Sequence, residues 1–163
     1  NVSPKARLTK VDYGKDPKNY QAAPIKITFS YEIPEYAVRD GNLLYFRPMV
    51  MNHLYDQVKS YLRINTDLKN RDFGFKDGCS RLVELDETLT LPKGFSMEGK
   101  ARSDSYQSGA ADFNGSLSQQ GNKLTLHQKL ALKKRVYDAS DWQGFRTAVN
   151  MHKSYGDYII IHN

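Results

Sequence analysis

The sequence predicts an all-β protein, an antiparallel β-sandwich with a short C-terminal helix. Several stretches alternate apolar and polar residues with a period of two, which is typical of strands that bury one face. Turn-forming residues separate these stretches at hairpin spacing, and because parallel strands need long crossovers, short turns favour antiparallel pairing. We expect about seven to nine strands. The clearest alternation occurs in residues 25–33, 82–91, 111–118 and 122–135.

Residues 122–162 predict a strand, a capped helix and a second strand. Ser140 and Gln143 have the spacing of a capping box and introduce a helix with one apolar side. The apolar residues of this helix are Trp142, Phe145, Ala148 and Val149. The final run of residues 158–161, Tyr-Ile-Ile-Ile, is rich in β-branched residues and predicts a buried strand. We expect the helix to pack onto one edge or open end of the sandwich core.

Composition divides the chain into a lead-in segment and a main domain. Residues 1–24 combine mixed charge with several prolines and a weak strand near residues 6–11, so we expect a lead-in from an upstream domain. Residues 25–163 form the predicted sandwich domain. Because the chain begins with Asn1 rather than Met, we expect a fragment or a processed chain.

The segments between strands carry further predictions. Asp40, Gly41 and Asn42 predict a hairpin turn. Apolar residues at helical spacing in residues 48–63 predict a short helix. Residues 99–109 are rich in serine and charge, and they predict a mobile polar loop.

Composition also limits the classes of function. A chain of 163 residues is long enough for one hydrophobic core. Its formal net charge of +6 comes from 24 basic and 18 acidic residues, and because the two signs are interspersed we interpret it as a modest charge that favours solubility. No apolar run approaches the roughly 20 residues that span a bilayer. The single cysteine, Cys79, excludes an internal disulfide.

Three stretches together resemble a known family. Residues 88–95 read TLTLPKGF and are similar to the family's strand and "LPxGY" turn. Residues 130–137 and 141–146 resemble its closing strand and the helix with the pattern aromatic-x-x-Phe-Arg. Residues 31–36 with 43–46 are similar to its "IPxYA" hairpin.

The family is the uncharacterised β-rich domain that lies C-terminal to a transglutaminase-like cysteine core in secreted or envelope-anchored proteins of Gram-negative bacteria. The resemblance covers most of residues 25–163. It implies a non-catalytic accessory domain, an extracytoplasmic location in the periplasm or at the cell surface, and an upstream transglutaminase-like domain as partner. A cell-envelope protein or glycan is the other partner that we consider.

Cysteine chemistry is the enzymatic alternative. Cys79, His127 and either Asp138 or Asp141 follow the Cys, His, Asp order of a transglutaminase-like triad. Such a nucleophile needs a helix N-terminus to lower the thiol pKa, whereas Cys79 precedes an alternating strand pattern. His127 falls on the lysine-bearing, solvent-facing side of its predicted strand. We therefore interpret Cys79 as a small buried thiol and predict no catalytic residue.

Residue spacing does not support a metal or cofactor site. The histidines show no ligand spacing, and the chain has no Cys pair or P-loop. We interpret the histidines as surface or cap residues, and we predict no metal ligand and no cofactor. They are His53, His127, His152 and His162.

Two surface features remain candidates for binding. A basic run predicts a solvated strand face and no nucleic-acid partner, because only one strand carries it and Tyr137 is the only aromatic residue near it that could stack on bases. This run consists of Lys129, Lys133, Lys134 and Arg135. Tyrosines could instead form the surface of a carbohydrate-binding module, which is the alternative binding function. The candidates are Tyr36, Tyr45, Tyr55, Tyr61 and Tyr106.

Overall fold

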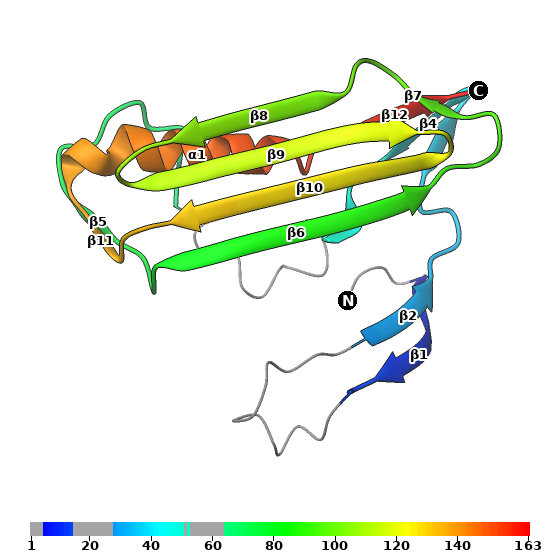
Figure 1. The fold of residues 1–163 in the computed structure, drawn as a ribbon, viewed down its shortest axis with the longest axis horizontal. Coiled ribbons are helices and arrows are strands. Elements are labelled where there is room, and N and C mark those ends of the chain that lie inside the picture. The colour runs from blue at the N-terminus through cyan, green and yellow to red at the C-terminus, as the bar shows by residue number, and fades with distance from the viewer. Residues whose placement is uncertain (1–4, 15–27, 51, 53–63) are drawn as a thin grey trace. The chain divides into compact units, whose positions relative to one another are not determined.

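Figure 1 shows the computed structural model of the chain. The chain forms two compact units, Asn1–Tyr36 and Ala37–Asn163, which are described separately below. The residues that the structure describes are 5–14, 28–50, 52 and 64–163.

The first unit contains a two-stranded antiparallel sheet. Strand β1 (Arg7–Asp12) pairs with β2 (Thr28–Glu32), with a register shift between Leu8 and Lys10. Both strands were expected, although the sequence did not predict that they pair. The expected boundary at residue 24 falls in a part of the chain outside the described residues.

A four-stranded antiparallel sheet dominates the second unit (Figure 1). Its strands, in spatial order, are β6 (Arg81–Thr90), β10 (Lys123–Leu132), β9 (Ala111–Gln120) and β8 (Arg102–Gln107). We call this the large sheet. Its inner face carries the buried residues of β10, such as Leu124 and Leu130, and its outer face carries the alternating residues Thr125, His127 and Lys129. The predicted period of two is confirmed.

A second four-stranded sheet and a two-stranded sheet complete the unit, and their pairings are antiparallel. In spatial order the second sheet contains β3 (Val38–Asp40), β4 (Leu43–Phe46), β12 (Ile159–His162) and β7 (Ser96–Met97), and the small sheet pairs β5 (Phe75–Lys76) with β11 (Val136–Tyr137). Gly41 forms the predicted turn between β3 and β4 with a φ of 57°, a conformation that glycine adopts without strain. The all-β class is confirmed.

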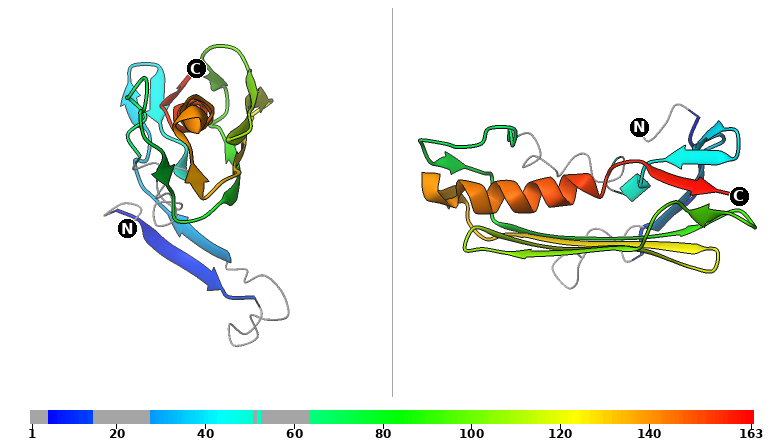
Figure 2. Two further views of the ribbon diagram at one scale, coloured as in Figure 1. Left: turned by 90° about the vertical axis from the view of Figure 1, so that its left-hand side faces the viewer. Right: turned by 90° about the horizontal axis from the view of Figure 1, so that it is seen from above.

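The helix α1 (Trp142–Ser154) covers the inner face of the large sheet (Figure 2). It contacts β8, β9 and β10 and runs along them, so the predicted position at an edge or open end is wrong. The helix lies flat because its apolar side extends over its whole length. The buried residues of the helix are Trp142, Phe145, Ala148, Val149 and His152. Among the described residues, no helix has the length and apolar character of a membrane span.

The capping contacts of the helix differ from the prediction. The carboxylate of Asp141 accepts a hydrogen bond from the N–H of Asp138 at 2.9 Å. Gln143 points elsewhere, and its Nε2 donates to the carbonyl oxygen of Lys69 at 2.5 Å. Asp138 and Asp141 therefore cap the 3₁₀ turn Ala139–Asp141 that leads into the helix, and the predicted pair of Ser140 and Gln143 is not formed.

Residues 99–109 contain the strand β8, so the predicted mobile loop is wrong. β8 pairs with β9 from Arg102 opposite Leu117 to Gln107 opposite Asp112. Neither side of β8 is apolar, and alternation in hydropathy therefore gave no signal. Its inner-face residues are Arg102, Asp104 and Tyr106, and its outer-face residues are Ser103, Ser105 and Gln107.

The predicted helix at residues 48–63 falls largely outside the described part of the chain. At its start, the carboxylate of Glu87 on β6 accepts hydrogen bonds from the N–H groups of Met49 (2.9 Å) and Val50 (3.1 Å). This contact anchors the segment after β4 to the large sheet.

Candidate functional site

The structure does not assemble the predicted cysteine triad. His127 lies on β10 opposite Asp86, and its Nδ1 is 2.6 Å from Asp86 Oδ1. Cys79 lies in the loop before β6, where the N–H of Asp77 donates to the carbonyl oxygen of Arg135 at 3.0 Å. That contact holds the loop beyond the end of β10. Because β10 ends five residues after His127, about 17 Å of strand separates the loop from the imidazole.

Cys79 is exposed, so its interpretation as a buried thiol is wrong. It lies between the strands β5 and β6 and not at the start of a helix. The helix dipole that would stabilise a thiolate is therefore missing at this position.

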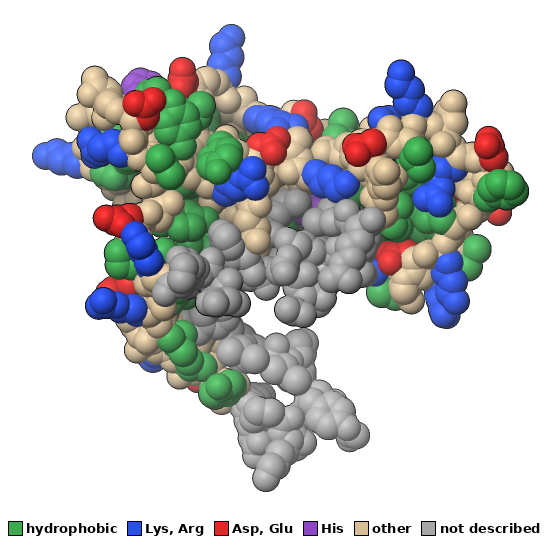
Figure 3. All heavy atoms as spheres, turned by 180° about the vertical axis from the view of Figure 1, so that it is seen from behind, with side chains coloured by type: hydrophobic (Ala, Val, Ile, Leu, Met, Phe, Trp, Pro, Cys, Tyr) green, Lys and Arg blue, Asp and Glu red, His purple; other side chains and the backbone are tan. Residues whose placement is uncertain are grey.

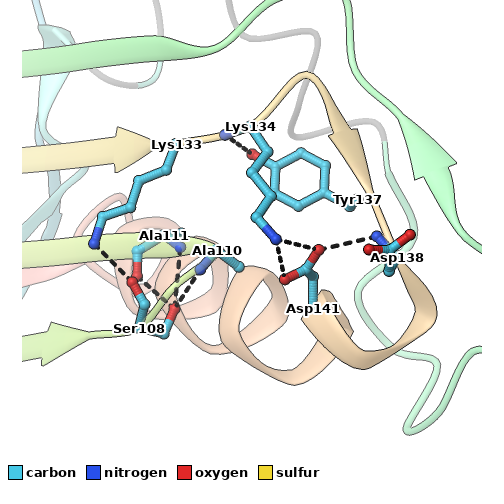
Figure 4. Close-up of polar contacts among 8 residues, drawn as sticks. All are labelled: Ser108, Ala110, Ala111, Lys133, Lys134, Tyr137, Asp138 and Asp141. Carbon is cyan, nitrogen blue, oxygen red and sulfur yellow. Dashed lines mark hydrogen bonds and ion pairs between the residues drawn. The ribbon is translucent and has the colours of Figure 1, made fainter.

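Asp138 and Asp141, the two alternatives for the third triad position, hold the start of the helix in place (Figure 4). Lys134 Nζ lies 2.7 and 2.8 Å from the two carboxylate oxygens of Asp141. This hydrogen bond is the main reason that the pKa of Asp141 lies below its ordinary value. The phenol oxygen of Tyr137 accepts the N–H of Lys134 at 3.4 Å. These contacts, with the bond to Asp138, fix the turn between β10 and the helix.

A second group of contacts joins β10 to the hairpin between β8 and β9 (Figure 4). Ser108 Oγ accepts the N–H of Ala111 at 3.0 Å and donates to its carbonyl oxygen at 2.8 Å. Lys133 Nζ donates to the carbonyl oxygen of Ser108 at 2.7 Å and lies 2.7 Å from Asp112 Oδ1. Both groups stabilise the fold, since each polar atom in them bonds to a neighbouring strand or turn.

The three lysines of the basic run are paired with carboxylates. Lys129 lies 2.6 Å from Glu84, Lys133 lies 2.7 Å from Asp112, and Lys134 lies 2.7 Å from Asp141. On the face of the second unit that Figure 3 shows, Lys and Arg side chains also alternate with Asp and Glu side chains. The run therefore forms no concentrated positive patch of the kind that binds phosphate backbones.

The histidines occupy different environments. His127 is half-buried beside Asp86, and His162 is exposed at the end of β12. His152 is fully buried against Phe113, with ring centroids 6.1 Å apart, so its assignment to the surface is wrong. Burial lowers the pKa of His152 to about 4. His53 lies outside the described residues. Among the described residues, no group of three metal-ligating side chains comes together.

A polar cluster on the inner face of β8 was missed by sequence reasoning. Arg102 forms an ion pair with Asp104, and its Nη2 donates to Ser154 Oγ at 2.8 Å. The phenol of Tyr155 donates to Asp104 Oδ2 at 3.0 Å, and the guanidinium of Arg102 lies 4.2 Å from the centre of the Tyr155 ring. This cluster ties the edge strand to the end of the helix.

Electrostatics in this cluster favour a structural role. Burial, together with the nearby Asp104, raises the pKa of Tyr155 to about 12, so the phenol stays a neutral donor. Burial alone would raise the pKa of Asp104, but hydrogen bonds from Arg102 and Tyr155 hold it below its ordinary value. Neither group is placed near a neutral pKa, which is where general acid–base catalysis works best.

An apolar hollow of about 330 Å³ lies next to this cluster, between β12 and the connection from β7 to β8. Tyr158 on its rim is 59% exposed, and the guanidinium of Arg47 lies 4.5 Å from the centre of its ring. The hollow is lined by Met97, Glu98, Gly99, Lys100, Arg102, Leu117, Tyr158, Ile159 and Ile160.

The predicted tyrosine surface is not found in the described part of the chain. Tyr36, Tyr45 and Tyr106 are half-buried, and Tyr106 packs against the core. Tyr55 and Tyr61 lie outside the described residues. The exposed aromatic residue beside a hollow is Tyr158. It directly precedes β12, so its predicted place in a buried strand is wrong.

Fold and site together define a β-rich domain with a helix packed on its main sheet and no assembled catalytic group among the described residues. The chain belongs to DUF3858, a family of domains of unknown function with a solved structure, whose profile matches residues 42–161. A comparison with curated proteins finds no match.

One solved structure shares the fold with a TM-score of 0.61 and 10% sequence identity. It is a crystal structure of a protein from Parabacteroides distasonis ATCC 8503 that is named a "putative protease". The match covers 76% of this chain and 24% of that protein, so this chain spans about a quarter of its length.

Proposed function

We propose that this chain is a non-catalytic accessory domain of a larger, envelope-associated protein, where it supports or orients a transglutaminase-like domain. The observation that carries the proposal is the match to a fold that forms only 24% of a larger protein whose name refers to proteolysis. The separation of Cys79 from His127 supports it further, because a nucleophile so far from its base cannot be activated by it.

The neighbouring domain and the location are tested together by mapping the natural full-length product. Intact mass and N-terminal sequencing would be measured on protein recovered from fractionated cells. We expect an upstream transglutaminase-like core and a processed N-terminus in the periplasmic or surface fraction. A cytoplasmic product without such a core would overturn the proposal.

Catalysis by this chain itself is tested with a fluorogenic peptide panel and a thiol-reactive probe. We expect probe labelling of the exposed Cys79, but no peptide turnover above that of the Cys79→Ser variant. Turnover that disappears in Cys79→Ser and in His127→Ala would establish the cysteine enzyme instead. The labelling and turnover assays separate an accessible thiol from an activated one.

Carbohydrate binding is the second candidate, and the observation in its favour is Tyr158, because sugar rings stack on exposed aromatic side chains. Calorimetry across a glycan panel would measure it. The matched control for Tyr158→Ala is Tyr13→Ala, since Tyr13 is similarly exposed at 57% but lies in the other unit. No binding at all would remove this candidate, and binding that survives Tyr158→Ala would show that Tyr158 does not form the site.

A further inference from the structure

The edge strands of the second unit are not equally protected. Exposed edges invite pairing with another chain, and natural proteins protect them by shortness, charges, proline or bulges. In the second sheet the edges are short, with three residues in β3 and two in β7. In the large sheet, β6 carries the charged residues Glu84 and Asp86 on its outer face.

The other edge of the large sheet, β8, has none of these protections on its outer face (Figure 1). It is six residues long, pairs with β9 without a register shift and contains no proline or lysine. Its outer-face residues are uncharged: Ser103, Ser105 and Gln107. Inward-pointing charges can also protect an edge, and β8 has two of them, Arg102 and Asp104. They pair with each other and bond to Ser154 and Tyr155 of the same chain, so they leave the outer face of the edge uncharged. No described strand pairs with its free side.

We propose that β8 pairs with β8 of a second copy of this chain, antiparallel and about a two-fold axis, so that two large sheets become one continuous sheet. An isologous contact of this kind is the commonest way in which identical chains associate. This proposal is independent of the accessory role proposed above, because the dimer needs no transglutaminase-like domain.

The residues of β8 select one register. Residues directly opposite in an antiparallel pair point to the same face, so either Asp104 or Ser105 must lie on the two-fold axis when the overlap is longest. Asp104 on the axis would place two carboxylates opposite each other, which is unfavourable. Ser105 on the axis places Ser103 opposite Gln107, and the hydroxyl and amide groups can hydrogen-bond across the pair.

The inner face is compatible with the same register. Asp104 then lies opposite Tyr106 of the second copy, and the half-buried Tyr106 becomes more covered. The outer edge is uncharged and complementary to itself, which favours a second copy over a charged partner strand. A contact between single strands is smaller than the roughly 1,200 Å² of a standard interface, so we expect a reversible dimer in about the micromolar range.

Sedimentation velocity on the 163-residue chain from about 1 µM to about 1 mM tests this. We expect the sedimentation coefficient to rise with concentration from monomer to dimer. Ser105→Lys would place two lysines on the two-fold axis and should weaken association at least about tenfold, a change equivalent to roughly 1.4 kcal/mol. The matched control is Ser118→Lys, because Ser118 is exposed on the same face but lies on the interior strand β9.

Hydrogen exchange gives a second measurement that does not depend on a variant. We expect protection of the β8 amides to increase with concentration, while protection of the β6 edge stays constant. A monomer at every concentration would overturn the dimer and leave the edge to a strand from another protein. A dimer that resists Ser105→Lys, or that shows no change in β8 protection, would also overturn it.

Discussion

The inner and outer faces of the large sheet come from the same strands but differ in what they contribute. On the inner face, the core side chains of β9 and β10 are at most 2% exposed and pack against the helix; Phe113 and Leu126 are examples. On the outer face, neighbouring strands are linked by ion pairs such as that between Lys129 and Glu84, whose side chains are about half exposed. Burial of apolar area contributes far more than exposed ion pairs, so we expect stability to reside in the inner face.

The aromatic cluster under the helix shows how the inner face is closed. The ring of Phe75 on β5 stacks on Tyr137 at 4.7 Å between centroids and meets Trp142 and Phe145 edge-on at 5.5 and 4.9 Å. The sheet of β5 and β11, with two residues in each strand, thus provides two of the four rings. A very short element is essential here because of the side chains that it positions.

The largest expected effect is that of Trp142→Ala. Trp142 is 1% exposed, and its Nε1 donates to the carbonyl oxygen of Leu68 at 3.0 Å. Removing the indole leaves a cavity and an unpaired carbonyl, so the free energy of unfolding should fall by about 3–5 kcal/mol in urea titrations. Tyr158→Ala, which removes an aromatic ring that is 59% exposed, is the control and should cost far less. A loss below about 1 kcal/mol for Trp142→Ala would contradict the packing of the helix on the sheet.

The next effect tests how tightly the inner face is packed. A Cβ at Gly115 would lie 2.6 Å from Phe113 Cζ and 2.7 Å from Tyr155 Cζ. Gly115→Ala should therefore lower the free energy of unfolding by about 1–3 kcal/mol through overpacking. Gly109→Ala is the matched control, because a Cβ there meets no atom within 4 Å. Equal stability of the two variants by thermal unfolding would show that the inner face can relax around a methyl group.

The buried His152 should make stability depend on pH. Because burial lowers the pKa of His152 from 6.5 to about 4, the unfolded chain takes up a proton at a pH where the folded chain does not. The contribution is complete above pH 6.5 and is lost progressively as the pH falls from 6.5 to about 4. Between pH 8 and pH 5.5 the free energy of unfolding should decrease by about 1 kcal/mol because of this group.

The variant His152→Gln separates this effect from other titrations. The described carboxyls with lowered pKa start from 4.5 (Glu35) or from 3.8 (Asp104, Asp112 and Asp141), so their contribution is lost only at lower pH. Urea titrations of the variant should therefore be nearly flat between pH 8 and pH 5.5. The same slope in the variant and the parent chain would mean that His152 is not the titrating group.

The contrast between apolar and polar strand faces explains which strands the sequence could predict. Where one face of a strand is apolar, as in β6, β9 and β10, the period of two is visible and the strands were predicted. Where both faces are polar, as in β8 with Arg102 and Asp104 turned inward, hydropathy contains no alternation. The charges on the inner face of β8 are satisfied by Ser154 and Tyr155, some 50 residues away in the chain.

Whether the candidate catalytic residues form a site depends on the distances between them, and a single sequence does not contain these distances. The order Cys79, His127 and Asp141 fitted a triad, but the register of β6 and β10 places the cysteine loop and the imidazole at different levels of the sheet. His152 shared its helix stripe with Val149 at helical spacing, so its burial could have been predicted from that periodicity. The exposure of Tyr158 had no local signal, because this residue directly precedes the isoleucines of a strand that is largely buried.

The smallest effect is expected on the outer face. Glu84→Gln removes the partner of Lys129, to which Glu84 lies at 2.6 Å in the structure. Because both side chains are about half exposed, water screens the pair and its loss should change the free energy of unfolding by less than about 0.5 kcal/mol. The difference should shrink further in about 1 M NaCl, where the Debye length is about 3 Å. The control is Lys129→Gln, which breaks the same pair from the other side, and the double variant should show almost no coupling. A coupling above about 1 kcal/mol would contradict the conclusion that the inner face carries most of the stability. An ion pair of that strength must be shielded from solvent, so the result would indicate that the outer face of the sheet is covered in solution.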